Sequence, residues 1–110
     1  MVGIDVVHVS RIENVCDMSA FIDKYFSVRE KKYVFDKNER TRAQTVAGLF
    51  AAKEAVLKLV GCGLTHAPRR VEVLDLQRGL ACYQTQLYQL TPLELPATHE
   101  GFLARPLSVG

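Results

Sequence analysis

The spacing of hydrophobic and polar residues changes from one segment of the chain to the next, and these changes predict the order of its elements. The β-branched run Val2–Val9 predicts a strand that is buried on both faces. A short helix is expected next, with Ser10 as its N-cap, Glu13 in the capping-box position and an end near Val15. The chain is therefore expected to begin with a strand followed directly by a helix.

Two more short helices and one long helix are predicted in the following half of the chain. Asp17 or Ser19 can cap the first of these, and the "SVRE" capping box at Ser27–Glu30 opens the second. The polar stretch Asp36–Arg42 is the expected loop before the long helix, which runs over residues 41–60.

Glycines are expected to end the long helix, because Gly61 and Gly63 follow its last apolar residue and glycine readily adopts the left-handed conformation there. The apolar residues of this helix surround it instead of forming one stripe. Such a helix is normally buried against other elements or against another subunit.

The last third of the chain predicts an antiparallel hairpin. Val71–Leu76 and Leu80–Tyr88 alternate apolar and polar residues, and Gln77–Gly79 supplies a turn between them. No element is assigned from Thr91 onward, where three of the four prolines lie. A strand, then helices, then a hairpin predicts an α+β fold with an antiparallel sheet packed on the long helix.

Composition narrows the class of protein. The 110 residues fit one domain, 1–110, and 48% hydrophobic with 24% charged residues is ordinary for a globular chain. A net charge of +2 gives no indication of nucleic acid as a partner, and no apolar run is long enough for a membrane span. Three widely spaced cysteines without a CxxC pair favour reduced thiols and a cytoplasmic location.

The chemistry-bearing residues of the long helix are Glu54 and Lys58, which lie one turn apart beside apolar neighbours. One interpretation is an ordinary i,i+4 ion pair on an exposed edge. The other is a functional site, because a carboxylate in apolar company needs a cation, either Lys58 or a metal ion.

The second unusual acid is Asp5, since aspartate is depleted in strands. It either points to water from an edge strand or joins Glu54 in a site of two carboxylates. Two carboxylate groups suit Mg²⁺, which keeps several waters and usually also binds substrate phosphate. Lys58 would then hold a phosphate or accept a proton from a nucleophile.

The three histidines are weaker candidates for site residues than Asp5, Glu54 and Lys58. His8 is expected to be packed or hydrogen-bonded, His66 follows the glycines in a connector, and His99 falls in the unassigned tail. The chain has no GxSxG motif and no Walker-type loop.

"VGIDVVHVSRIE" near the start and "AGLFAAKEAVLKLVGCG" on the long helix together resemble the holo-(acyl-carrier-protein) synthases, small bacterial 4′-phosphopantetheinyl transferases. That family has a G-I/L-G-I/L-D-I/L start and an AGRFAAKEA-x-x-K-A-x-G-x-G helix. The likeness runs in order and spacing over residues 2–88.

The resemblance implies a Mg²⁺-dependent enzyme that transfers 4′-phosphopantetheine from coenzyme A to a serine of apo acyl carrier protein and releases 3′,5′-ADP. It implies that Asp5 and Glu54 are the metal ligands and that Glu54 and Lys58 are catalytic, with Lys58 near the transferred phosphate. The same match places Gly61 and Gly63, together with Lys58, against coenzyme A. Arg11 would face the acidic carrier protein, and the assembly would be a homotrimer, which also explains a helix apolar all round.

Three departures from the family's pattern stand out. Leu49 replaces the arginine of AGRF, and "GLA" at 79–81 replaces a G-K-P turn. The family's strand V-S-I/L-S-H, and the apolar strand after it, are represented only by "PLSV" at 106–109, so the final strand is expected to be incomplete. Two alternatives therefore stay open: a non-catalytic relative that binds coenzyme A or carrier protein, and a structural oligomer in which Glu54 and Lys58 form a plain ion pair.

Overall fold

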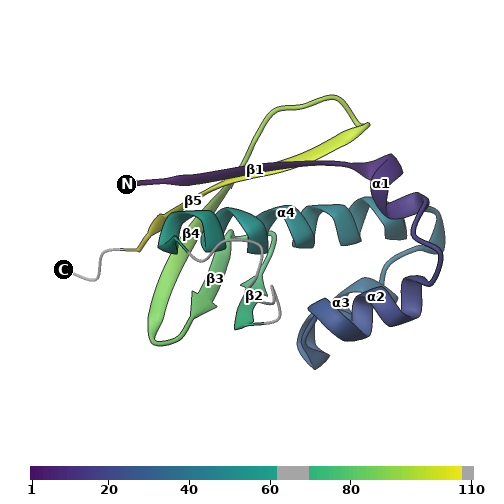
Figure 1. Cartoon of the computed structure of the whole chain (residues 1–110), viewed down its shortest axis with the longest axis horizontal. Coiled ribbons are helices and arrows are strands. Elements are labelled where there is room, and N and C mark those ends of the chain that lie inside the picture. The colour runs from purple at the N-terminus through teal and green to yellow at the C-terminus, as the bar shows by residue number, and fades with distance from the viewer. Residues whose placement is uncertain (62–69, 108–110) are drawn as a thin grey trace.

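The computed structural model describes residues 1–61 and 70–107, which fold around one long helix (Figure 1). In chain order the elements are β1 (Gly3–His8), α1 (Val9–Glu13), α2 (Met18–Tyr25), α3 (Val28–Phe35), the 3₁₀ turn η1 (Glu39–Thr41), α4 (Arg42–Val60), β2 (Val71–Asp75), β3 (Leu80–Tyr83), β4 (Gln86–Pro92) and β5 (His99–Pro106).

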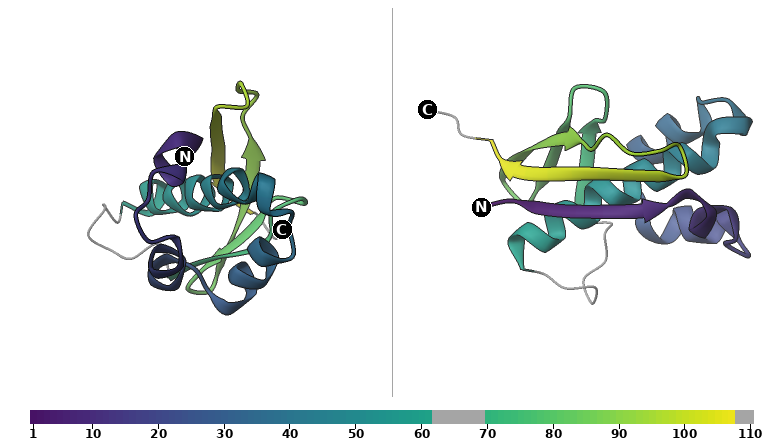
Figure 2. Two further views of the ribbon diagram at one scale, coloured as in Figure 1. Left: turned by 90° about the vertical axis from the view of Figure 1, so that its right-hand side faces the viewer. Right: turned by 90° about the horizontal axis from the view of Figure 1, so that it is seen from above.

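The strands form one five-stranded antiparallel sheet in the order β1-β5-β4-β3-β2. β1 and β2 are therefore its edges, and β5 pairs with β1 from Gly3 opposite Ala104 to His8 opposite His99. β1 and β5 lie side by side along α4 (Figure 2, right). The predicted α+β fold with an antiparallel sheet is confirmed.

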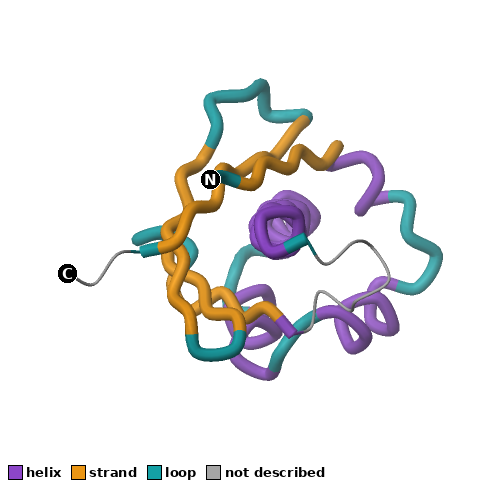
Figure 3. The backbone as a smooth tube through the Cα atoms, turned by 60° about the vertical axis from the view of Figure 1, so that its left-hand side comes forward, coloured by secondary structure: helices purple, strands orange, loops and turns teal. Residues whose placement is uncertain are grey.

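Helix α4 is enclosed by the rest of its own chain. Every residue from Val46 to Leu57 is buried. Seen along the helix, the curved sheet lies on one side of α4, and the shorter helices lie on the other (Figure 3). The all-round apolar character is thus explained within one chain and requires no second subunit. In the described part of the chain, no helix combines the length and apolarity that a membrane crossing requires.

Most predicted helix boundaries are confirmed. The Asp17 carboxylate accepts a hydrogen bond from the Ala20 N–H at 3.0 Å, and Ser27 and Glu30 form the complete capping box of α3. Gly61 ends α4 with φ 76°, a left-handed conformation that costs glycine little. Gly63 lies outside the described residues.

Two expectations for the first elements are wrong. β1 is buried on one face only, because Ile4 and Val6 on its outer face are 47% and 43% exposed. α1 begins two residues earlier than predicted, with His8 at the N-cap position and no side-chain cap, so Ser10 is inside the helix. β-Branched residues favour a strand on either face, so composition alone could not show that one side stays uncovered.

The predicted strand Leu80–Tyr88 is in fact two strands. A tight turn at Gln84 and Thr85 reverses the chain between β3 and β4. Gln84 adopts φ 56°, which is uncommon for a residue other than glycine, so the turn lacked a sequence signal. The turn before β3 was predicted correctly at 77–79.

The tail from Thr91 onward, for which no element was predicted, contains a strand. β5 is an eight-residue strand in the interior of the sheet, paired with β1 on one side and β4 on the other. It begins at His99 and ends at Pro106. The prolines of this segment left it without a predicted element.

A buried ion pair that sequence analysis did not predict joins three elements. Lys53 of α4 pairs with Glu30 of α3, and both side chains are fully inaccessible to solvent. The Glu30 carboxylate also accepts hydrogen bonds from the N–H of Ser27 at 2.8 Å and of Val73 in β2 at 2.7 Å. The Lys53 ammonium and two backbone N–H groups thus satisfy the Glu30 charge, which would otherwise be costly to bury.

Candidate functional site

Four of the sequence-predicted site residues line one pocket between β1, α1 and α4. The pocket has a volume of about 260 Å³ and is lined by Asp5, Arg11, Phe50, Glu54 and Lys58. Phe50 was not predicted, although it lies one turn before Glu54 on the same helix. Residues separated by 53 positions in the sequence, Asp5 and Lys58, are in direct contact here.

Asp5 enters the pocket because β1 turns this residue toward α4. Gly3, Asp5 and Val7 face the helix, whereas the residues between them face outward. Gly3 allows this approach: a β-carbon at that position would lie 2.1 Å from the Ala55 carbonyl oxygen and 2.8 Å from the Leu59 nitrogen. β1 is an edge strand, as one interpretation of Asp5 required, but its carboxylate is directed inward and is only 14% exposed.

Glu54 is the more deeply placed carboxylate, with 6% of its surface exposed. Burial raises its pKa above the ordinary value of 4.5, and the negative charge of Asp5 raises the pKa further. The positive charges of Lys58 and Arg11 lower it, but by less. The two carboxylates are therefore close enough to repel each other.

Lys58 does not form the predicted surface pair with Glu54. Its Nζ donates a hydrogen bond to Asp5 Oδ1 at 2.7 Å, and the lysine side chain is 55% exposed. The interpretation of Glu54 and Lys58 as an i,i+4 pair on an exposed edge is wrong, because the acid is buried and the lysine bridges to another strand. Lys58 stands at the rim of the pocket with its remaining N–H groups toward solvent.

Arg11 closes the pocket from α1. Its guanidinium lies over the Phe50 ring at 5.6 Å from the ring centre. Phe50 in turn contacts Phe21 and Tyr25 of α2 through ring centres 5.4 and 5.7 Å apart. This aromatic cluster gives the short helices a fixed position beside the pocket, while Arg11 itself is exposed.

The donors in this pocket fit a hard divalent cation. Mg²⁺ is usually held by one or two carboxylates, with water and substrate phosphate completing its shell, and the pocket offers the oxygens of Asp5 and Glu54. A cation between them would turn their mutual repulsion into attraction. Among the described residues there is no cluster of three or more acidic, histidine or cysteine side chains for a fully protein-made metal site.

The remaining predicted residues lie elsewhere. Gly61 ends α4, outside the lining of the pocket, and Gly63 is outside the described residues. His99 was not predicted as a site residue. It faces His8 across β1 and β5 with ring centres 4.1 Å apart, and its Nδ1 lies 2.7 Å from the Thr98 hydroxyl. A histidine at the start of a segment with apolar residues was the signal that could have identified His99 as a candidate.

Replacing Gly3 by alanine is expected to separate β1 from α4. The added methyl group meets helix backbone, which cannot turn aside, so the free energy of unfolding should fall by about 1–3 kcal/mol. Withdrawing Asp5 and admitting water should also lower the pKa of Glu54, which NMR titration of its carboxyl carbon measures.

Gly79→Ala is the matched control, since its β-carbon would lie 2.1 Å from the Leu90 carbonyl oxygen at the other edge of the sheet. This variant should lose stability and keep the Glu54 pKa. An unchanged Glu54 pKa in Gly3→Ala would contradict the role given to this close approach.

Comparison with known proteins agrees with the fold and the pocket. The model of the 4′-phosphopantetheinyl transferase superfamily matches residues 1–99. A holo-(acyl-carrier-protein) synthase of Caldicellulosiruptor saccharolyticus is 30% identical over 113 residues, covering 94% of this chain and 89% of that protein. The synthase of Clostridium acetobutylicum is 48% identical over 63 residues, which cover 56% of this chain and about half of the relative, 49%.

Solved structures show the same architecture. The holo-(acyl-carrier-protein) synthase of Bacillus anthracis, solved in complex with CoA (3′,5′-ADP), superposes with a TM-score of 0.79 at 24% identity, covering 96% of this chain and 93% of that chain. The Helicobacter pylori synthase, solved with coenzyme A, gives 0.77 at 20% identity and covers 97% and 100%. These likenesses define the class of fold, a long helix enclosed by an antiparallel sheet and short helices.

The chain belongs to the 4′-phosphopantetheinyl transferase superfamily. The family predicted from the start of the chain and from the FAAKEA helix is thereby confirmed.

Proposed function

We propose that this protein is a holo-(acyl-carrier-protein) synthase, which transfers 4′-phosphopantetheine from coenzyme A to a serine of apo acyl carrier protein. The observation that carries the proposal is the placement of Asp5, Glu54 and Lys58 in one pocket, from a strand and a helix far apart in sequence. The names of the relatives and the CoA-bound structures in the same superfamily support the same activity.

In this proposal the carboxylates of Asp5 and Glu54 would hold Mg²⁺. When bound, the ion supplies positive charge that neutralises the diphosphate of coenzyme A. Asp5 and Glu54 fix its position because one is anchored by β1 against α4 and the other is buried in the helix. The low accessibility of both carboxylates also limits competition from water.

Lys58 is assigned to hold a phosphate oxygen. Its ion pair with Asp5 shows a lysine acting as a hydrogen-bond donor, and an ammonium group has donors but no acceptor. As an ammonium group, Lys58 is suited to binding a phosphate oxygen and not to removing a proton from the serine. The serine oxygen forms the new bond to the phosphorus nearer pantetheine, and the bond to 3′,5′-ADP breaks. We assign Gly61 and Gly63 to the coenzyme A site on the family pattern alone.

Arg11 is assigned to the carrier protein. Its exposed guanidinium lies over the Phe50 ring beside the pocket. A planar cation in that position suits a carboxylate of an acidic partner. This would bring the carrier serine to the side of the pocket where Asp5 and Glu54 lie.

Intact-mass spectrometry of apo acyl carrier protein tests the function. Incubation with this protein, coenzyme A and Mg²⁺ should add about 340 Da, the mass of the phosphopantetheine arm. EDTA should abolish the gain, and added Mg²⁺ should restore it. A folded protein that binds coenzyme A without producing the gain would instead be the non-catalytic relative.

We further propose that the protein assembles as a homotrimer through the outer face of β1. Ile4 and Val6 are exposed on this edge strand, and strands of this kind pair or pack readily. Sedimentation velocity should give a trimer that Val6→Lys shifts toward monomer. Val28→Lys, at an exposed valine of α3, is the control and should leave the trimer intact. A trimer unaffected by Val6→Lys would exclude this face.

A cytoplasmic location is proposed for the same protein. Cys16 and Cys82 are both free thiols among the described residues, which suits a reducing compartment.

A further inference from the structure

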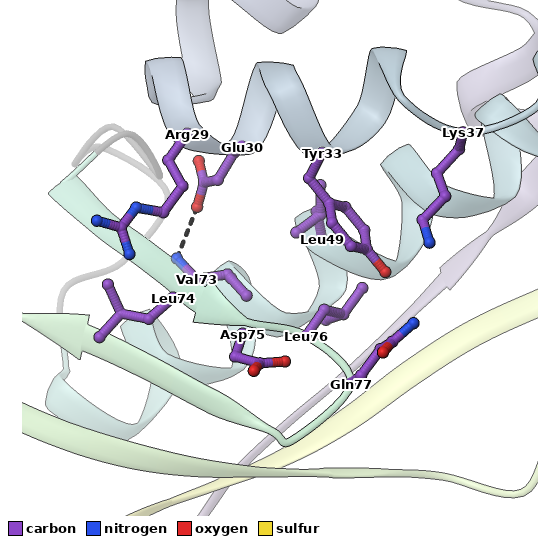
Figure 4. Close-up of a pocket in the computed structure, with 10 residues that line it drawn as sticks. All are labelled: Arg29, Glu30, Tyr33, Lys37, Leu49, Val73, Leu74, Asp75, Leu76 and Gln77. Atoms are coloured by element: carbon purple, nitrogen blue, oxygen red, sulfur yellow. Dashed lines mark hydrogen bonds between the residues drawn. The ribbon is translucent and has the colours of Figure 1, made fainter.

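A second pocket lies on another side of α4, between α3, α4 and the edge strand β2 (Figure 4). Its volume is about 350 Å³, near the lower end of the range of about 300–1,000 Å³ for small-molecule sites. Leu49 of α4 contributes to this pocket and Glu54 to the candidate active site. Five positions separate them, which is about 140° around the helix, and the two pockets share no lining residue.

One wall of this pocket is a row of three side chains from α3 and from the turn that follows it. Arg29 and Tyr33 are four residues apart and lie on one face of α3, and Lys37 follows two residues after the helix ends at Phe35. Figure 4 shows Arg29 and Tyr33 reaching from α3, and Lys37 from the chain after it, toward β2 and the turn that follows β2. The capping box at Ser27 and Glu30 fixes the start of α3 and hence the direction of this row.

The two cations of the row are available to a ligand. Within residues 1–61 and 70–107, Arg29 has neither a hydrogen bond nor an ion pair. Lys37 lies with its Nζ 4.7 Å from the centre of the Tyr33 ring, which orients it without neutralising its charge.

The acidic groups near the pocket are already engaged. Glu30 is inaccessible to solvent and paired with Lys53 and with two backbone N–H groups. Asp75 Oδ1 accepts the N–H of Arg78 in its own turn at 3.0 Å, and its Oδ2 lies 3.7 Å from the guanidinium Nε of the same arginine. The charge offered to a ligand is therefore positive, above a floor that contains the apolar side chains of Leu49, Val73 and Leu76.

We propose that this pocket binds a small organic anion with a flat apolar body, such as an aryl carboxylate or aryl phosphate. The body would pack on the Tyr33 ring and the apolar floor, and the anionic group would bind Arg29 or Lys37. Arg29 and Lys37 lie on either side of the Tyr33 ring along the pocket wall, and this arrangement matches a ligand with an anionic group and a flat apolar body. A neutral or cationic ligand would not use the two positive charges.

The probe is 1-naphthyl phosphate, with neutral 1-naphthol as its counterpart. Titration of the ¹⁵N-labelled protein by NMR should give saturable shifts at residues of α3 and β2. Loss of the phosphate charge should weaken binding at least about tenfold, since hydrogen bonds to charged groups are stronger than those between neutral groups. Binding of 1-naphthol with equal affinity would contradict a charge-selective site.

Variants locate the site. Arg29→Gln or Lys37→Gln should weaken the probe about two- to fivefold each, as expected for partly exposed ion pairs, and the two changes together should abolish saturation. Lys32→Gln, an exposed lysine of α3 that does not line the pocket, is the charge-matched control and should bind normally. Shifts confined to β1 and the end of α4, unaffected by the double change, would place the phosphate at Lys58 and overturn the proposal. The assay needs no transferase activity, so its outcome is independent of the proposed function.

Discussion

Replacing Glu54 by glutamine is expected to reduce phosphopantetheine transfer at least about a hundredfold. The change removes one of two carboxylates that would hold Mg²⁺, whose charge stabilisation amounts to several kcal/mol, and 1.4 kcal/mol is a factor of ten in rate. Glutamine has nearly the same shape, so Phe50 and the helix backbone should keep their places. The rate is measured by mass spectrometry of the carrier protein at saturating coenzyme A.

The stability of this variant serves as its control. Because the pKa of Glu54 is raised in the folded protein, the stabilisation from its proton is fully present below pH 4.5 and is lost as pH rises through the folded pKa. Above that pKa the ionised group costs stability, which glutamine avoids. The difference in unfolding free energy between variant and wild type should therefore shift in favour of the variant as pH rises.

Two results would contradict this account. A Glu54→Gln variant that transfers phosphopantetheine at the wild-type rate would show that Glu54 is not a metal ligand. A stability difference that does not depend on pH would show that the carboxyl group is not buried against the charge of Asp5.

Replacing Lys53 by methionine is expected to lower the free energy of unfolding by about 3–5 kcal/mol, because the variant leaves the Glu30 charge buried without its cation. A domain of this size has only about 5–15 kcal/mol in total, so the variant would be partly unfolded at moderate temperature. Urea denaturation followed by circular dichroism measures the change. Glu30 also holds the Val73 N–H at the edge of β2, so the loss should spread to the sheet.

The paired variant Lys53→Met with Glu30→Leu separates charge from packing. Removing both charges should recover much of the stability, although the Ser27 and Val73 N–H groups lose their acceptor. As a surface comparison, Lys31→Met removes the exposed pair with Asp23 and should change stability by less than about 1 kcal/mol. A Lys53→Met variant as stable as the Lys31 control would show that the buried pair contributes little.

Local sequence determined much of this protein, because short-range chemistry specifies short-range structure. The Ser27 capping box, the Asp17 cap and the left-handed Gly61 were all predictable, since each depends on a hydrogen bond or a backbone preference within a few residues. The burial of α4 also followed from its composition. Asp5 and Glu54 were identifiable because an acid in an apolar segment conflicts with its neighbours.

The tertiary structure decided which groups meet. Lys58 has Glu54 one turn away in sequence, but it bonds to Asp5, because β1 lies along α4 where Gly3 lets it approach. The Glu30–Lys53 pair, the reversal at Gln84 and the central place of β5 had no local signal, because each depends on contacts between distant segments. Sequence therefore determined the helices, the first strand and the candidate acids. Their pairing, and the shift in the Glu54 pKa that follows from it, arose only when burial and neighbouring charges were brought together in space.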